Sequence, residues 1–228
     1  MASHKVRAVN TAPDSENRIH SMETALRYGF RDGLVPGVTV YGYLCVPVLE
    51  HFGRKWFECG SAKLRLLKPY FEGEWVEVDA AVSGESLHIE AAGPRAIVDA
   101  SMSPLLELPA MVPAFCGRDK VIASEESLAV GTKLGSYQAM DLTTPESLLE
   151  AANMAFMANY ALEPWIHTGS IVQHFRGAGS ASVRGAIVQE YERKGHRLVD
   201  IDYCYVCDNG AVCARVLHTA IWKLRIAT

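Results

Sequence analysis

The sequence predicts an α+β fold, and three observations lead to this prediction. The apolar segment 36–52 carries hydrophobic residues at helical spacing. Several shorter segments after it alternate apolar and polar residues, as half-buried strands do. The same order, a long helix followed by alternating segments, returns in the second half of the chain. We therefore interpret the sequence as an internal repeat of one helix-and-sheet unit.

The bulk properties of the 228-residue chain are those of an ordinary globular protein with a sizeable core. Its formal net charge of −4, with no run of Lys or Arg, argues against a nucleic-acid partner. The N-terminus lacks the apolar stretch of a signal peptide, and the longest apolar segment is broken by Pro36 and Pro47. Six cysteines suit a reducing compartment. We expect a cytoplasmic protein with no membrane partner.

The first unit is predicted to span residues 1–103. Residues 1–13 are polar and are expected to be irregular. A short helix is predicted over 21–31, and the long helix over 36–52, where Pro47 should kink the helix or mark its last turns. The strands expected after it are 62–67, 76–82, 87–91 and 96–102.

A proline-rich segment, 104–118, is predicted to link this unit to a second, divergent one over 119–228. The second unit opens with a helix over 144–162. A Gly-Ser pair follows each long helix and enters an alternating segment, at 60–61 and at 169–170. Three long strands are expected at 181–191, 197–207 and 211–224, the last two joined by the hairpin signal Asp208-Asn209-Gly210.

The polar loop ahead of the long helix resembles the signature of the MaoC-like hydratases, a hot-dog-fold family. That signature reads Asp-x-Asn-Pro-x-His, then a helix, then His-Gly before the central helix. Asn17, His20 and Gly37 match its Asn, His and Gly, whereas Ser15 stands at the Asp position and Pro36 at the second His. The resemblance implies two tandem hot-dog units, each a long central helix wrapped by a curved antiparallel sheet.

The same resemblance implies a hydratase or dehydratase that acts on an α,β-unsaturated or 3-hydroxyacyl thioester. Coenzyme A would enter as part of the substrate, and no separate cofactor is expected. His20 would act as base or acid. Glu16 or Asp14 would supply the carboxylate that Ser15 lacks, and Asn17 would hold the loop or orient the imidazole.

The start of the long helix is the candidate oxyanion site. Backbone N–H groups of Gly37 and Val38 would bind the developing enolate oxygen, and Tyr41, one turn further on, would face the substrate. No metal site is predicted. Cys204 and Cys207 lie three apart in a strand pattern, so their side chains would point to opposite faces.

Three histidines of the second half are weaker candidates, and for each a structural role is favoured. His167 and His174 lie around the second Gly-Ser pair and could face the pocket of the first half. His196, in a basic turn, could meet a phosphate of coenzyme A.

Two other functions stay open at this point. One is a divergent lyase, isomerase or cyclase that acts on a non-thioester small molecule, because such chemistry needs only one base and an oxyanion site. The other is a non-catalytic binder of an acyl ligand. For either function, and for the hydratase, a homodimer is one expected assembly.

Overall fold

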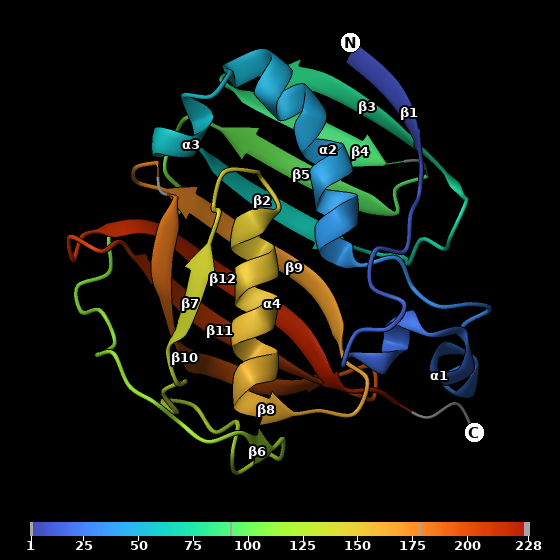
Figure 1. Ribbon diagram of the computed structural model, residues 1–228. Coiled ribbons are helices and arrows are strands. Elements are labelled where there is room, and N and C mark those ends of the chain that lie inside the picture. The colour runs from blue at the N-terminus through green and yellow to red at the C-terminus, as the bar shows by residue number, and fades with distance from the viewer. Residues whose placement is uncertain (1, 92, 178, 226–228) are drawn as a thin grey trace.

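The structure is a computed structural model that describes residues 2–91, 93–177 and 179–225. Its main feature is a ten-stranded sheet in the order β1-β3-β4-β5-β2-β9-β12-β11-β10-β7, in which every neighbouring pair is antiparallel (Figure 1). The first five strands in this order come from the first half of the chain: β1 (Ala2–Arg7), β3 (Trp75–Ser83), β4 (Ser86–Ala91), β5 (Ala96–Ser101) and β2 (Ser61–Leu66). The others come from the second half: β9 (Ile166–His174), β12 (Val212–Lys223), β11 (His196–Val206), β10 (Ser180–Arg193) and β7 (Tyr137–Met140).

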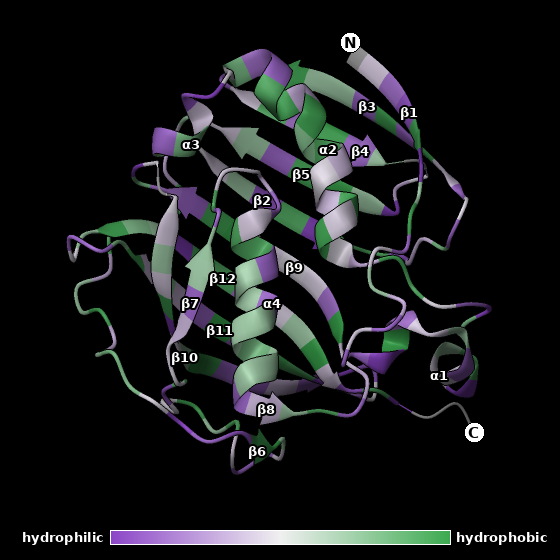
Figure 2. Cartoon of the chain, viewed as in Figure 1, coloured by the Kyte–Doolittle hydropathy of each residue, from purple (hydrophilic) through white to green (hydrophobic). Residues whose placement is uncertain are grey.

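Two long helices lie over one face of this sheet (Figure 1). Helix α2 (Gly37–Phe52) contacts β3, β4 and β5, and helix α4 (Ser147–Asn159) contacts β7, β10 and β12. Figure 2 shows hydrophobic residues along both helices, and their buried side chains join one continuous core with those of the strands. The short elements are a 3-10 turn, η1 (Arg18–His20), with α1 (Met22–Arg27), α3 (Trp56–Cys59) and the two-residue strands β6 (Val121–Ile122) and β8 (Tyr160–Ala161).

The two halves meet where β2 pairs with β9, and the strand order outward from this junction is the same in both. Outward from β2 come β5, β4, β3 and β1, and outward from β9 come β12, β11, β10 and β7. In each half, therefore, the first strand of this sheet after the long helix pairs with the last strand of that half. The chain follows one topology twice.

The helix α2 and seven strands, β2 to β5 and β10 to β12, lie where the sequence predicts them. Their ends agree with the predicted ones to within one or two residues. Pro36 is the N-cap of α2, and Pro47 lies inside the helix without ending it. Residues 104–118 contain neither helix nor strand, as expected for the linker. The Asp208-Asn209-Gly210 turn joins β11 to β12, and Gly210 has a φ of 81°.

Four local predictions were wrong. Residues 2–7 are not irregular but form β1, an edge strand that pairs with β3. The helix predicted over 21–31 ends at Arg27, because Gly29 takes a φ of 81° and closes the turn, and the helix predicted over 144–162 covers only 147–159. Residues 169–170 lie inside β9 rather than at its start, where they pair with β2.

Within the described residues, none of the helices combines the length and apolar character that a membrane span needs.

Candidate active site

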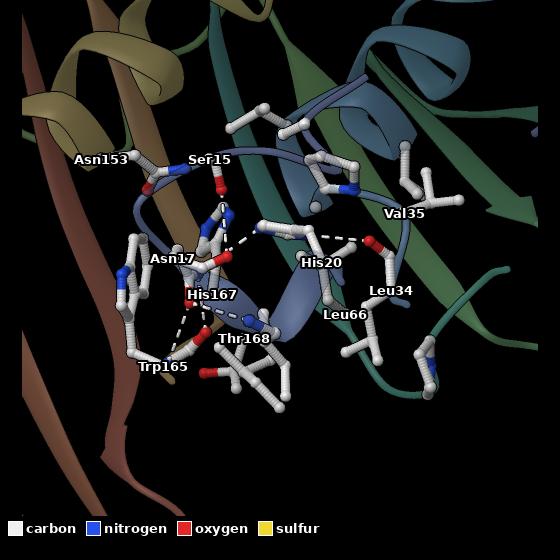
Figure 3. A pocket seen from close by; sticks show the side chains of 18 of the residues that line it. Ser15, Asn17, His20, Leu34, Val35, Leu66, Asn153, Trp165, His167 and Thr168 are labelled. Carbon is white, nitrogen blue, oxygen red and sulfur yellow. Dashed lines mark hydrogen bonds between the residues drawn. The ribbon is translucent and has the colours of Figure 1, made fainter. Parts of the chain in front are cut away.

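A cavity of about 390 Å³ opens where the two halves of the sheet meet. Its wall is formed by the loop before α1, the first turn of α2, the end of β2, the start of β9 and one side of α4. Much of the lining is apolar, including Phe30, Leu34, Leu67, Met154 and Ile221. The polar lining groups that matter for chemistry come from both halves: Ser15, Asn17, His20, Asn153 and His167 (Figure 3).

Local hydrogen bonds fix the loop that carries His20. Asn17 caps η1, since its side chain accepts a hydrogen bond from the Ile19 N–H, and Ser21 caps α1. The amide of Asn10 donates to the carbonyl oxygen of His20 at 2.8 Å. The polar residues that predicted a loop are therefore the ones that hold its backbone in place.

The protonation of His20 follows from its partners. Its Nδ1 lies 2.7 Å from the carbonyl oxygen of Leu34, and because a carbonyl only accepts, Nδ1 carries the proton. Nε2 is then the bare nitrogen, and the amide of Asn17 lies 3.4 Å from it (Figure 3). Burial lowers the pKa of His20 below its ordinary value of 6.5. The imidazole is thus a neutral base at pH 7.

Asn17 also ties the loop to the second half of the chain. Its Nδ2 donates to the carbonyl oxygen of Trp165 at 3.0 Å, and its Oδ1 accepts from the N–H of Trp165 at 3.2 Å. Asn17 is only 7% exposed, so each of these polar groups depends on its partner. Asn17 therefore joins the loop to the second half of the chain and lies beside Nε2 of His20.

We expect Asn17→Ala to lower the free energy of unfolding by about 2 kcal/mol, because it leaves the buried N–H and C=O of Trp165 without a hydrogen-bond partner. Urea denaturation of the purified variant measures this change. Asn209→Ala, in an exposed turn, is the control and should change stability by no more than about 0.5 kcal/mol. Equal stability of the two variants would contradict the bridging role.

The first turn of α2 forms another part of the wall. Gly37 and Val38 line the cavity, and none of the described side chains caps this helix end. The first N–H groups of a helix have no partner within it and carry a partial positive charge. A Cβ atom on Gly37 would collide with Leu66 and stand 3.2 Å from Nδ1 of His167. Glycine therefore lets the start of the helix pack closely against Leu66 and His167.

The structure does not bring every predicted residue to the cavity. Asp14 and Glu16 are exposed and are not among the residues that line it, and Glu16 instead forms an ion pair with Lys120. Ser15 does line it, but its hydroxyl donates to the Asn17 carbonyl oxygen at 3.0 Å. Neither acid of this loop therefore replaces the missing aspartate by position.

Tyr41 also lies away from the cavity wall. Its side chain is fully buried in the core, because at this point of α2 the helix face turns toward the sheet. Its hydroxyl has no hydrogen-bond partner among the described residues, and burial raises the pKa of this phenol well above its ordinary value of 10. Tyr41 packs the helix onto the sheet and does not face a ligand.

Two residues of the second half, His167 and Asn153, also line the cavity. The sequence analysis favoured a structural role for His167 and did not identify Asn153. His167 at the start of β9 lines it, whereas His174 packs against Trp56 and Phe57, and His196 is the first residue of β11. Asn153 lies on α4 with its Oδ1 buried and, within the described chain, without a partner. A polar amide within the apolar stripe of a helix is a signal that could have indicated it.

Comparison with known proteins defines the fold. No protein-family model matches the sequence, and no curated protein matches it significantly. Solved structures do match over nearly the whole chain. The dehydratase domain of PpsC from Mycobacterium tuberculosis, in complex with C12:1-CoA, has 8% identity and a TM-score of 0.56, and the match covers 96% of this chain and 92% of that one.

Two further matches widen the range of proteins that share this architecture. A putative thioesterase II from Thermobifida fusca has 11% identity and a TM-score of 0.53, covering 97% of this chain and 92% of that one. A conserved protein of unknown function with hot-dog fold from Alicyclobacillus acidocaldarius has 10% identity and a TM-score of 0.54, covering 98% and 93%. The chain therefore has a hot-dog α+β fold, and at these identities the likeness carries no more than the fold.

Proposed function

We propose that this protein is a MaoC-like hydratase or dehydratase of α,β-unsaturated or 3-hydroxyacyl thioesters, built from two tandem hot-dog units. The observation that carries the proposal is the bare Nε2 of His20 in the same cavity as the uncapped first turn of α2. One group can move a proton, and the other can stabilise an oxyanion. Together they meet the two chemical needs of adding water to an enoyl thioester.

The hydration step uses these groups as follows. His20 Nε2 takes a proton from water while the water oxygen bonds to C3 of the enoyl thioester. The C2–C3 π electrons move toward the carbonyl, and the enolate oxygen accepts hydrogen bonds from the N–H groups of Gly37 and Val38. His20 then returns the proton to C2, so the product gains one water and the imidazole returns to its neutral form. Dehydration is the reverse.

The shape of the cavity supports an acyl thioester as the ligand. Its apolar lining suits an acyl chain, and Lys68 at its wall is exposed and could meet a phosphate of coenzyme A. PpsC, a dehydratase domain of the same fold, was solved with a C12:1-CoA ligand. The repeated strand order about the β2–β9 junction supports the two-unit arrangement, with the ligand held between the units.

A second candidate is a lyase, isomerase or cyclase that acts on a non-thioester small molecule. It is favoured by the position of Asp14 and Glu16 outside the cavity, because hydration in the MaoC-like family uses a carboxylate together with the histidine of the same loop. The acid that does line the cavity, Glu150, comes from α4 in the other half of the chain. Chemistry that needs one base and one oxyanion site would not require that carboxylate.

The test is an assay of the purified chain with crotonyl-CoA. The proposal expects the enoyl absorbance to fall and 3-hydroxybutyryl-CoA to form, identified by mass spectrometry, with no release of free thiol. Release of free coenzyme A, detected with a thiol reagent, would instead indicate a thioesterase. Absence of both changes at high enzyme concentration would overturn the proposal and leave the non-thioester reaction as the next to test.

A further inference from the structure

His167, from the second half of the chain, lies in the wall of the cavity and has one ring nitrogen without a hydrogen-bond partner among the described residues. The side chain is only 6% exposed, and this nitrogen is its Nδ1. This nitrogen lies close to the first turn of α2, 3.2 Å from the position that a Cβ of Gly37 would occupy. Figure 3 shows His167 and His20 in the wall of one pocket, although they come from different halves.

The neighbours of His167 determine which of its nitrogens carries the proton. Nε2 lies 3.2 Å from the carbonyl oxygen of Gly169 and 2.9 Å from Oγ of Ser170. Because the carbonyl can only accept, Nε2 is the protonated nitrogen and Nδ1 is bare.

A second histidine completes this arrangement behind the cavity wall. Ser170 Oγ lies 3.1 Å from Nδ1 of His218, to which its hydroxyl can donate. The rings of His167 and His218 stack with their centroids 4.3 Å apart. Burial lowers the pKa of His167 to about 4, so the ring is neutral at pH 7. The imidazole is therefore held as a fixed hydrogen-bond acceptor in the wall of the cavity.

We propose that Nδ1 of His167 accepts the second hydrogen of the water that His20 activates, and holds the hydroxyl of the 3-hydroxyacyl product. This inference rests on the proposed function. The proton balance is unchanged: one water hydrogen passes through His20 to C2, and the other stays on the C3 oxygen, hydrogen-bonded to His167. His167 would thereby replace, from the other half of the chain, the water-holding role of the carboxylate that is absent at Ser15.

The neighbouring amide of Asn153 does not specify the ligand in the same way. A carboxamide presents either its oxygen or its N–H₂ after a rotation, so it can serve a donor or an acceptor. His167 is fixed by Gly169 and Ser170 and can only accept. The group bound between the halves must therefore be a donor, as water and an alcohol are.

The kinetic test compares His167→Phe with His174→Phe on crotonyl-CoA. His174 is a matched control, since it lies on the same strand, is 5% exposed, has a pKa lowered to about 4 and lies outside the cavity. We expect His167→Phe to lower kcat about a hundredfold with KM within about twofold, and His174→Phe to change neither by more than about twofold. His167→Asn, which can present an oxygen near the same place, should recover part of the rate and serves if the Phe variant does not fold.

A binding test separates this inference from the proposed function. Two unreactive amide analogues of pantetheine thioesters are compared by calorimetry, one with a 3-hydroxybutyryl and one with a butyryl group. The wild type should prefer the hydroxyl compound about tenfold, and His167→Phe should lose the preference while His174→Phe keeps it.

The outcomes are distinct. In one outcome, the wild type fails to hydrate crotonyl-CoA while His167→Phe loses the hydroxyl preference that the wild type shows. This pair of results would contradict the proposed reaction but support the hydroxyl site. Two results would overturn the role of His167. One is a hydroxyl preference that survives in His167→Phe, and the other is a kcat of His167→Phe that stays within about twofold of the wild type.

Discussion

Replacing His20 by Ala is expected to lower kcat for the hydration of crotonyl-CoA by about a thousandfold, the loss typical of a removed general base. The physical reason is that Nε2 of His20 is the bare, neutral nitrogen on the first-half wall of the cavity, while its other nitrogen is occupied by the carbonyl of Leu34. Stopped-flow or progress-curve measurement of the enoyl absorbance gives the rate. The thermal transition should fall by only a few degrees, because the main loss is the hydrogen bond from Nδ1 to the carbonyl of the buried Leu34.

The matched control for this variant is His51→Ala, on the exposed side of α2 near its other end. It removes an imidazole from the same half of the chain without touching the cavity, so its rate should equal that of the wild type. A His20→Ala enzyme that keeps the wild-type rate would remove the mechanism. A His20→Ala enzyme that loses the rate only by unfolding would be recognised from its circular dichroism.

Acidification from pH 7 to pH 5 is expected to destabilise the protein by about 2 kcal/mol for each of two buried histidines. Burial lowers the pKa of both His167 and His174 to about 4, whereas in the unfolded chain each titrates near 6.5. Between these values the unfolded state binds protons that the folded state does not. Stability is therefore complete above pH 6.5, falls as the pH drops toward 4, and takes no further loss from these groups below that.

A third buried histidine adds to the same effect, because burial and the neighbouring His167 lower the pKa of His218 well below 6.5. Urea denaturation at a series of pH values measures the slope. In His174→Phe the contribution of His174 is gone, so the loss of stability between pH 7 and 5 should shrink by about 2 kcal/mol relative to the wild type. An unchanged slope in this variant would mean that His174 does not titrate between the two states.

The helices and strands of this fold could largely be predicted from local patterns. Segment 36–52 has its apolar residues at helical spacing, and strands such as β3, β4 and β12 alternate buried and more exposed residues with a period of two. Both patterns are local consequences of burying one face. Edge strand β1 was missed for the complementary reason, since its exposed, charged residues leave little alternation to read.

Part of the candidate site could likewise be predicted from the sequence, and part could not. The loop with Asn17 and His20 and the glycine at the start of the long helix could be read from the sequence, because caps, turns and helix starts depend on near neighbours. The outward direction of Glu16 could not be predicted from the sequence, since Glu16 forms an ion pair with Lys120, 104 residues further along the chain.

What the sequence by itself determined is the order of elements and the first-half wall of the cavity. What only the tertiary structure decided is the other wall, where β9 and α4 bring His167 and Asn153 against the start of α2. The tertiary structure also decided the protonation of both imidazoles, because the carbonyl groups of Leu34 and Gly169 select the nitrogen that carries the proton. Each of these contacts lies within one half of the chain, over 14 residues for His20 and Leu34 and over two for His167 and Gly169. They depend on the orientation of the ring, which side-chain packing sets and which the residue spacing does not encode.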